Sequence, residues 1–174
     1  MEEGVLNGGQ WSAALAALML TGALVLGCEQ RTNDAAPRVL DAQTLQQRVA
    51  GSTGHPLLVV FWATWCQPCV AEMPDMVALD HESPSGLRVL AVSLDFFLSG
   101  QSTEKVVGDY LHVHPAPLEH VIYTGSQDAI FSAFDLPGNI PYSILYDSQG
   151  HVLKRFPGQT APEDVRGALS ELHG

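Results

Sequence analysis

The sequence is poor in positive charge and in cysteine, and each shortage argues against a class of protein. Its 174 residues contain 8 Lys and Arg against 19 Asp and Glu, for a net charge of −11 at pH 7. A nucleic-acid-binding surface needs clustered Lys and Arg, which this balance disfavours. The 3 cysteines are too few for a small fold held by disulfides, and their odd number leaves at least one with another role.

Charged residues are scarce in total, at 16%, whereas hydrophobic residues reach 46%. This composition excludes an intrinsically disordered chain. The sequence also lacks internal repeats, which argues against a solenoid. Its length supports one domain of ordinary size with a core of its own.

No charged residue occurs between Trp11 and Gly27. This stretch is at the short end for a membrane-spanning helix but suits a secretory signal. It ends in Val25-Leu26-Gly27-Cys28, which resembles the lipobox of bacterial lipoproteins. The resemblance implies a signal peptide over residues 1–27 that is removed on export, and a lipid attached to the sulfur of Cys28.

Residues 28–38 are polar and are expected to form a tether between the lipid and the domain. The domain is then exported and anchored to a membrane by lipid, facing the periplasm or another extracytoplasmic space. The amino terminus departs from this pattern, because Met1-Glu2-Glu3 is acidic where a signal is positively charged. An uncleaved membrane anchor and a buried helix of the fold are the alternatives for the apolar segment.

Apolar runs that alternate with helical patterns predict an α/β fold in which helices flank a mixed sheet. Residues 56–62 and 87–93 are typical of strands buried on both faces, and the helix between them completes a βαβ unit. A capping box at Thr160 predicts the last helix. The expected order is a helix from Asp41, strand 56–62, helix 66–79, strand 87–93, helix 103–114, strand 120–123, helix 128–134, a hairpin of strands 142–146 and 152–156 with Gly150 at a positive φ, and the last helix.

Two cysteines, Cys66 and Cys69, lie where the first long strand passes into its helix. At this spacing on a first helical turn they can form a disulfide with each other. The free N–H groups and the positive dipole end of the helix stabilise a thiolate on Cys66. Cys69 is expected to be more buried, so that Cys66 attacks and Cys69 resolves. The alternative, half of a structural zinc site, lacks its remaining ligands.

The segment Phe61–Cys69, with the sequence FWATWCQPC, and Glu72-Met73-Pro74 after it resemble the thioredoxin superfamily. Within it they are most similar to the membrane-anchored thiol-disulfide oxidoreductases of the TlpA/ResA type. The resemblance implies a thioredoxin-like domain over residues 39–174, with an extra helix and strand inserted after the second core strand. It also implies that Pro74 kinks the active-site helix without ending it.

A second mark of the superfamily is Gly138-Asn139-Ile140-Pro141. Pro141 resembles the cis-proline that faces the cysteines in these folds. A proline has no N–H, so it leaves room beside the sulfurs for a substrate strand. With Pro141, three further residues are expected to line the substrate groove: Trp65, Pro68 and Ile140.

One departure from thioredoxin bears on proton transfer. Val60 stands where thioredoxin has a buried Asp, so the usual proton acceptor for the buried cysteine is absent. Glu72, one helical turn after Cys69, is the expected substitute, because a carboxylate beside a thiol can take or give its proton. The alternative is that Glu72 is an ordinary solvent-exposed residue.

The resemblance implies an enzyme that reduces disulfides of exported proteins, with the Cys66–Cys69 disulfide as its redox centre and no other cofactor. Apocytochrome c is one target of this kind, and a membrane transporter of the CcdA/DsbD kind is the implied electron donor. A DsbA-like oxidant or isomerase would run the same chemistry in the other direction, and the reduction potential separates the two. A further alternative is a metal-binding chaperone that uses both cysteines as ligands.

No other residues are predicted to bind a metal, because the 7 histidines show no spacing that closes a site. Those in the inserted region are expected at a partner surface: His112, His114 and His120. The acidic residues of the active-site helix are expected to form an exposed face: Asp75, Asp80 and Glu82.

Overall fold

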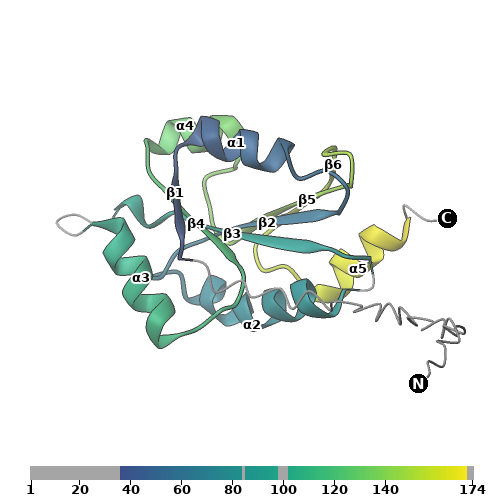
Figure 1. The fold of residues 1–174 in the computed structure, drawn as a ribbon, viewed down its shortest axis with the longest axis horizontal. Coiled ribbons are helices and arrows are strands. Elements are labelled where there is room, and N and C mark those ends of the chain that lie inside the picture. Colours follow the sequence, from purple (N-terminus) through teal and green to yellow (C-terminus); the bar gives the residue numbers. More distant parts are fainter. Residues whose placement is uncertain (1–35, 84, 98–101, 172–174) are drawn as a thin grey trace, which may run out of the picture. The chain divides into compact units, whose positions relative to one another are not determined.

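The computed structural model describes residues 36–83, 85–97 and 102–171, which form a mixed six-stranded sheet with helices on both faces (Figure 1). The strands are β1 (Arg38–Leu40), β2 (Leu57–Trp62), β3 (Arg88–Ser93), β4 (Glu119–Tyr123), β5 (Tyr142–Tyr146) and β6 (Val152–Pro157). The helices are α1 (Ala42–Ala50), α2 (Gln67–Glu82), α3 (Thr103–Val113), α4 (Gln127–Phe134) and α5 (Pro162–Ser170), with a short 3₁₀ helix, η1 (Asp95–Phe97), after β3.

The strand order is β1-β4-β3-β2-β5-β6. The first four of these strands run parallel, β5 is antiparallel to β2, and β6 is antiparallel to β5. Parallel strands end at the same edge of a sheet, so the segments that follow β2 and β3 are neighbours. We call this the carboxyl edge, comprising residues 62–66 and 93–95. The opposite side, where β2, β3 and β4 begin with Leu57, Arg88 and Glu119, is the amino edge.

Every residue of β2 is buried, because helices cover both faces of the sheet. Leu58, Val60 and Trp62 alternate onto the face covered by α2, α3 and α5. Leu57, Val59 and Phe61 point to the other face, which α1 and α4 cover (Figure 1). The continuous apolar run in the sequence therefore has a simple cause: both sides of this central strand lie in a hydrophobic core.

The elements expected from residue 41 onward are present. The Asp41 carboxylate caps α1 by accepting the Thr44 N–H at 2.8 Å. Helix α2 continues through Pro74 to Glu82, as the resemblance implied. Gly150 has a φ of 88° in the turn between β5 and β6, where a left-handed conformation favours glycine.

Two local expectations were wrong. Strand β1, which pairs with β4, was not predicted, and its first residue, Arg38, falls in the expected tether. The capping box at Thr160 does not form: Ala161 is the N-cap residue of α5 and makes no side-chain capping bond. The Thr160 hydroxyl instead donates to Ser143 Oγ on β5 at 3.0 Å, so it is not available to cap the helix.

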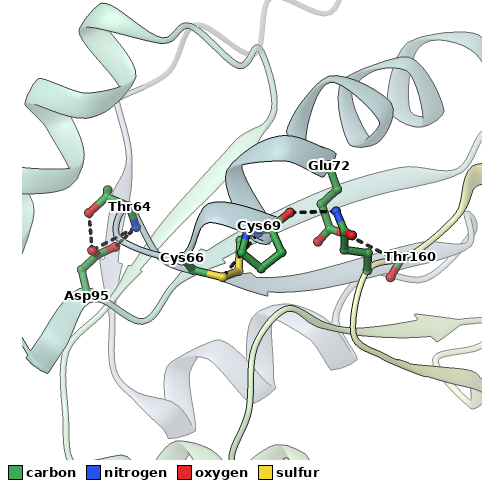
Figure 2. Close-up of a disulfide and its surroundings, with 8 residues drawn as sticks. Thr64, Cys66, Cys69, Glu72, Asp95 and Thr160 are labelled. Carbon is green, nitrogen blue, oxygen red and sulfur yellow. Dashed lines mark hydrogen bonds between the residues drawn. A yellow bond between two sulfur atoms is a disulfide. The ribbon is translucent and has the colours of Figure 1, made fainter.

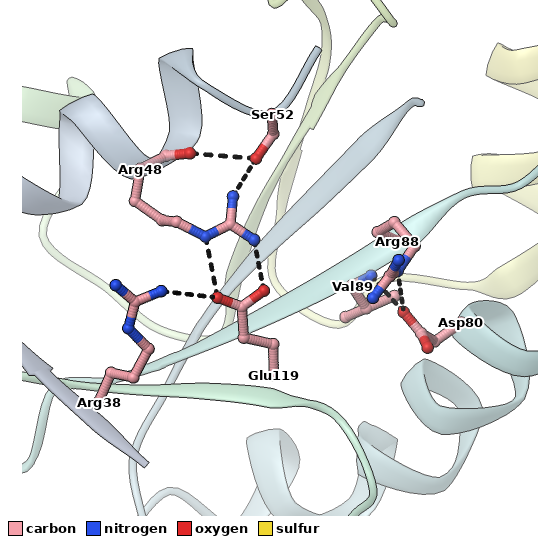
Figure 3. A network of polar contacts seen from close by, with 7 residues as sticks. All are labelled: Arg38, Arg48, Ser52, Asp80, Arg88, Val89 and Glu119. Atoms are coloured by element: carbon pink, nitrogen blue, oxygen red, sulfur yellow. Dashed lines mark hydrogen bonds and ion pairs between the residues drawn. The ribbon is translucent and has the colours of Figure 1, made fainter. Parts of the chain in front are cut away.

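Asp80 was also misplaced, since it is buried and not part of an exposed acidic face. Its Oδ1 accepts the Val89 N–H at 2.7 Å and lies 3.9 Å from Arg88 Nε (Figure 3). The predicted signal peptide over 1–27 and the predicted lipid site at Cys28 lie outside the described residues. Within the part that is described, no helix has the length and apolar character needed to cross a membrane.

Candidate active site

The cysteines occupy the carboxyl edge, at the start of α2, and they are joined by a disulfide (Figure 2). Cys66 is the N-cap residue of the helix, and its sulfur accepts the Cys69 N–H at 3.4 Å. An N-cap side chain lies among backbone N–H groups that have no partner within the helix. A thiolate on Cys66 would therefore meet donors and the positive end of the helix dipole, as the sequence predicted.

The two sulfurs differ in accessibility. Cys69 is fully buried, whereas 6% of Cys66 is exposed. Trp65, immediately before Cys66, is half-exposed and borders it. A substrate sulfur can therefore approach Cys66 alone, and Cys69 can react only with a sulfur already bonded to Cys66.

Glu72 lies one turn beyond Cys69 on α2 and is 3% exposed, which excludes the solvent-exposed alternative. Its Oε2 accepts the Thr160 N–H at 2.8 Å, while Oε1 is buried without a hydrogen-bond partner (Figure 2). Burial raises the pKa of Glu72 from 4.5 to about 7, against the lowering effect of the Thr160 N–H, and the nearby charge of Asp75 adds to the rise. Glu72 can thus hold or release a proton near neutral pH.

Val60, at the position where thioredoxin carries its buried Asp, is fully buried on the same core face as both cysteines. An apolar side chain there leaves no proton acceptor on β2. Two carboxylates of α2 are buried, Glu72 and Asp80, and Glu72 is the one that lies a single helical turn from Cys69.

The Ile140–Pro141 peptide bond is cis. Tyr142 pairs with Phe61, so Pro141 lies at the level of Trp62, at the carboxyl edge where the cysteine loop begins. Ile140 is half-buried and packs against the core cluster that contains both cysteines. The structure therefore brings the 138–141 segment, distant in sequence, to the same edge as Cys66.

Pro68 occupies the first turn of α2, where its missing N–H costs no helical hydrogen bond. Its carbonyl accepts the Gln159 side-chain N–H at 3.2 Å. The turn before α5 thus contacts α2 twice, through Gln159 at Pro68 and through Thr160 at Glu72. These two contacts connect the disulfide helix to the segment that follows β6.

Asp95 is a residue of this site that the sequence reasoning missed. It is fully buried directly after β3, and its carboxylate accepts hydrogen bonds from both the N–H and the hydroxyl of Thr64 (Figure 2). The signal was available: Asp95 follows a buried strand parallel to β2, and the ends of adjacent parallel strands meet. A polar residue at that position would be expected next to the cysteine loop.

Of the three histidines expected at a partner surface, His112 and His114 are exposed, whereas His120 is internal. His120 is buried on β4, and its Nε2 lies 2.9 Å from the Ala116 carbonyl. Burial lowers the pKa of His120. The described residues contain no group of three or more Cys, His, Asp and Glu side chains arranged to hold a metal ion.

Comparison with known proteins places this geometry in a family. Residues 31–172 match the Redoxin family. The chain belongs to it. The thiol-disulfide oxidoreductase ResA of Oceanobacillus iheyensis is 38% identical over 153 residues, which cover 82% of this chain and 73% of that protein. ResA of Bacillus cereus is 28% identical over 120 residues, covering 68% of this chain and 64% of the relative, or just under two thirds of its length.

Solved structures share the same fold. The exposed lipoprotein thioredoxin of Streptococcus pneumoniae aligns with a TM-score of 0.59 at 22% identity, over 71% of this chain and 89% of that one. StoA of Bacillus subtilis aligns with a TM-score of 0.55 at 22% identity, over 68% and 85%. The described part of this Redoxin-family chain is thus a thioredoxin-like domain with a C-x-x-C disulfide, similar in sequence to thiol-disulfide oxidoreductases of the ResA type.

Proposed function

We propose that this protein is an exported, lipid-anchored reductase of protein disulfides, with the Cys66–Cys69 pair as its redox centre and no other cofactor. The observation that carries the proposal is the arrangement along α2. A reachable sulfur caps the helix, a buried sulfur lies one turn on, and a buried carboxyl group with a pKa of about 7 lies one turn further. Each position matches one step of thiol-disulfide exchange.

In the first step, the Cys66 thiolate of the reduced protein attacks one sulfur of a substrate disulfide. A bond forms between Cys66 and that sulfur, and the other substrate sulfur leaves as a thiolate that takes a proton from water. The N–H groups at the start of α2 favour the attacking thiolate. The substrate peptide crosses the edge between Trp65 and the 140–141 segment, where it can add to exposed backbone as an extra strand.

In the second step, Cys69 attacks the sulfur of Cys66 and releases the substrate. The Glu72 carboxylate takes the proton of the Cys69 thiol, because its pKa of about 7 matches the working pH and it lies on the same helix. The substrate leaves as a dithiol after Glu72 returns a proton to it through solvent. Two electrons have moved from Cys66 and Cys69 to the substrate, and the protein holds the disulfide seen in the structure.

The substrates are exported proteins with accessible disulfides, and apocytochrome c is one candidate. Similarity to ResA proteins supports exchange with exported partners. A membrane transporter of the CcdA/DsbD kind returns electrons to the disulfide. The lipid on Cys28 anchors the protein, and the tether over 28–38 lets the domain face the extracytoplasmic space. Replacing Cys28 with Ala is expected to move the protein from the membrane fraction to the soluble fraction.

The decisive experiment traps the substrate. In a Cys69→Ser variant the first step proceeds but the second cannot, so the substrate stays bonded to Cys66. We expect mass spectrometry of the trapped complexes to recover few proteins, each exported and carrying a cysteine pair. The matched control is Cys66→Ser with Cys69→Ser, which has no sulfur at the site and traps nothing. Capture of many unrelated exported proteins would support an oxidant or isomerase instead, and capture of none contradicts the proposal.

A further inference from the structure

The Asp95 carboxylate is fully buried, yet its hydrogen-bond donors are all neutral. Oδ1 accepts the Thr64 hydroxyl at 2.6 Å and the Thr64 N–H at 3.1 Å (Figure 2). Oδ2 accepts the Ser93 hydroxyl at 2.6 Å. The Thr64 N–H also lies 3.2 Å from Oδ2, which makes four donor contacts in total. Such a set of donors suits an ionised carboxylate, which can only accept hydrogen bonds. No ion pair within the described residues reaches it.

Thr64 connects this carboxylate to the reactive cysteine. It lies inside the turn closed by the Cys66 N–H on the Ala63 carbonyl, at 3.1 Å. That turn ends β2 and places Cys66 at the N-cap of α2. By bonding both the backbone and the side chain of Thr64, Asp95 fastens the turn to the end of the neighbouring strand β3.

We propose that Asp95 is a positioning residue for Cys66 and that its uncompensated charge disfavours the Cys66 thiolate, which makes the dithiol a better electron donor. The inference rests on the proposed reductase function and adds a reason why the dithiol gives electrons to a substrate instead of the disulfide accepting them. The start of α2 favours a negative charge on Cys66, and Asp95 opposes it from the β3 side. A less stable thiolate makes the reduced form less stable, and this shifts the pair toward giving up electrons.

The size of the effect follows from proximity. Two residues of chain span at most about 7 Å, so with the hydrogen bond to Thr64 and the cysteine side chain added, the carboxylate and the sulfur of Cys66 are within roughly 13 Å of each other. At that distance, with the effective dielectric typical of proteins, one charge changes the pKa of another group by about one unit, or about tenfold in its equilibrium.

Other titratable groups pack around the cysteines and must be separated from Asp95. Glu72 on α2 has a pKa of about 7. His120 on β4 lies against Trp62, with ring centroids 6.0 Å apart, and burial lowers its pKa. Tyr110 on α3 faces the same tryptophan at 5.7 Å, and burial raises its pKa. All three remain in an Asp95→Asn variant, so a difference between that variant and the wild type reports Asp95 alone.

The experiment equilibrates the protein with glutathione, in which two glutathione thiols reduce Cys66–Cys69 to the dithiol and become one glutathione disulfide. Asp95→Asn keeps an oxygen to accept from Thr64 but removes the charge. We expect its equilibrium constant for reduction to match the wild type at pH 6, well below the pKa of about 8.5 of a free cysteine, and to be about tenfold higher at pH 9, which is about 30 mV. Ultraviolet absorbance of the thiolate is expected to show that the pKa of Cys66 is about one unit lower in Asp95→Asn than in the wild type.

Two further variants test whether the effect is specific to the charge of Asp95. Thr64→Val removes the hydroxyl that donates to Asp95, so the charge of the carboxylate is less neutralised. At pH 9 the equilibrium constant for reduction of this variant is therefore expected to be about two- to threefold lower than that of the wild type. Asp147→Asn is the matched control. Asp147 is also buried and accepts the N–H groups of Gln149 and His151 at 2.8 Å each, but it follows β5 at the amino edge. We expect it to leave the equilibrium unchanged.

The outcomes distinguish a failure of the proposed reductase function from a failure of the inference about Asp95. The wild-type potential alone tests the reductase function, with a value near −270 mV or below supporting it and one near −120 mV contradicting it. The difference between Asp95→Asn and wild type tests the role of Asp95. A difference that is the same at pH 6 and pH 9 would reflect a general effect on folding and would overturn the inference, as would no difference at either pH.

Discussion

At the amino edge of the sheet, Glu119 and Asp80 lie beside guanidinium groups, whereas near the disulfide Asp95 and Glu72 have only neutral donors. Glu119 receives the Nε of Arg48 at 2.9 Å and a second, close contact from its Nη2, and Arg38 lies 3.7 Å away (Figure 3). Near the disulfide, Asp95 at the carboxyl edge and Glu72 on α2 accept hydrogen bonds from N–H and O–H groups alone.

The difference separates two uses of the same functional group. A carboxylate paired with an arginine has its charge cancelled nearby, so it contributes to stability and has little effect on other groups. A buried carboxyl group without a cation has a perturbed pKa or perturbs that of its neighbours. The uncompensated groups occur at the edge that carries the disulfide, where proton transfer is needed.

The largest expected effect comes from removing the uncompensated carboxyl group next to Cys69. Glu72→Gln cannot take the Cys69 proton, so we expect the release of a trapped mixed disulfide above pH 7 to slow by about 10- to 100-fold. In the wild type this rate should rise as the pH increases through about 7, where Glu72 becomes a carboxylate. Stopped-flow kinetics with a model disulfide across pH 5–9 measure both, and an unchanged profile in the variant contradicts the assigned role.

The same substitution is expected to change stability in a pH-dependent way. The pKa of Glu72 in the folded protein, about 7, lies above its ordinary 4.5, so the folded state binds this proton more tightly. Its contribution to stability is present below pH 4.5 and is lost as the pH rises to about 7. Glu72→Gln is therefore expected to raise the free energy of unfolding at pH 8 by about 2 kcal/mol and to change it little at pH 4.

Urea unfolding of the disulfide form at both pH values measures this effect. Glu163→Gln, which changes an exposed carboxylate at the start of α5, is the matched control. It is expected to change the free energy of unfolding by less than about 0.5 kcal/mol at either pH. If Glu72→Gln destabilises the protein equally at pH 4 and pH 8, the burial of a neutral Glu72 is not the source of its raised pKa.

A smaller effect is expected from breaking the compensated pair at the amino edge. Arg48→Met leaves the half-buried Glu119 with only its longer ion pair to Arg38, at 3.7 Å, and we expect a loss of about 1–2 kcal/mol in unfolding free energy. Because this edge is remote from the disulfide, the equilibrium with glutathione should not change. A shift in that equilibrium would remove the contrast between the two edges.

The smallest expected change in stability comes from breaking an exposed ion pair, which serves as the reference for the substitutions at both edges. Lys105 and Asp109 form an exposed ion pair on α3, with Nζ and Oδ2 2.5 Å apart. Exposed pairs at this helical spacing contribute little, so Lys105→Ala is expected to cost less than about 0.5 kcal/mol. Thermal unfolding at low and high salt measures it, and a cost as large as that of Arg48→Met would show that burial does not explain the difference.

Much of the local structure around the cysteines could be predicted from the sequence. Cys66 and Cys69 share one helical turn, so their spacing and the preceding apolar run specify a disulfide at a helix start. The continuation of α2 past Pro74 was implied by the resemblance carried by the Glu72-Met73-Pro74 motif. These features depend on residues within a few positions of one another, where helical and strand periodicity is directly visible.

The environment of the site depends on contacts between residues far apart in the sequence, which no local sequence pattern predicts. The Thr64 N–H meets a carboxylate 31 residues away, and Glu72 accepts an N–H from a residue 88 positions away. The capping box at Thr160 was a sound local pattern, yet tertiary contacts with Glu72 and Ser143 took its place. Asp80 likewise looked solvated within its helix, but packing buried it against β3.

By itself, the sequence determined which sulfurs can pair, which of them starts a helix, and which strands are buried, because chain geometry links neighbouring residues. Only the tertiary structure decided which carboxyl groups lose contact with water and whether a cation accompanies them. That outcome depends on how strands distant in sequence pack together, and it sets the local dielectric and hydrogen bonding on which the reactivity of the disulfide depends.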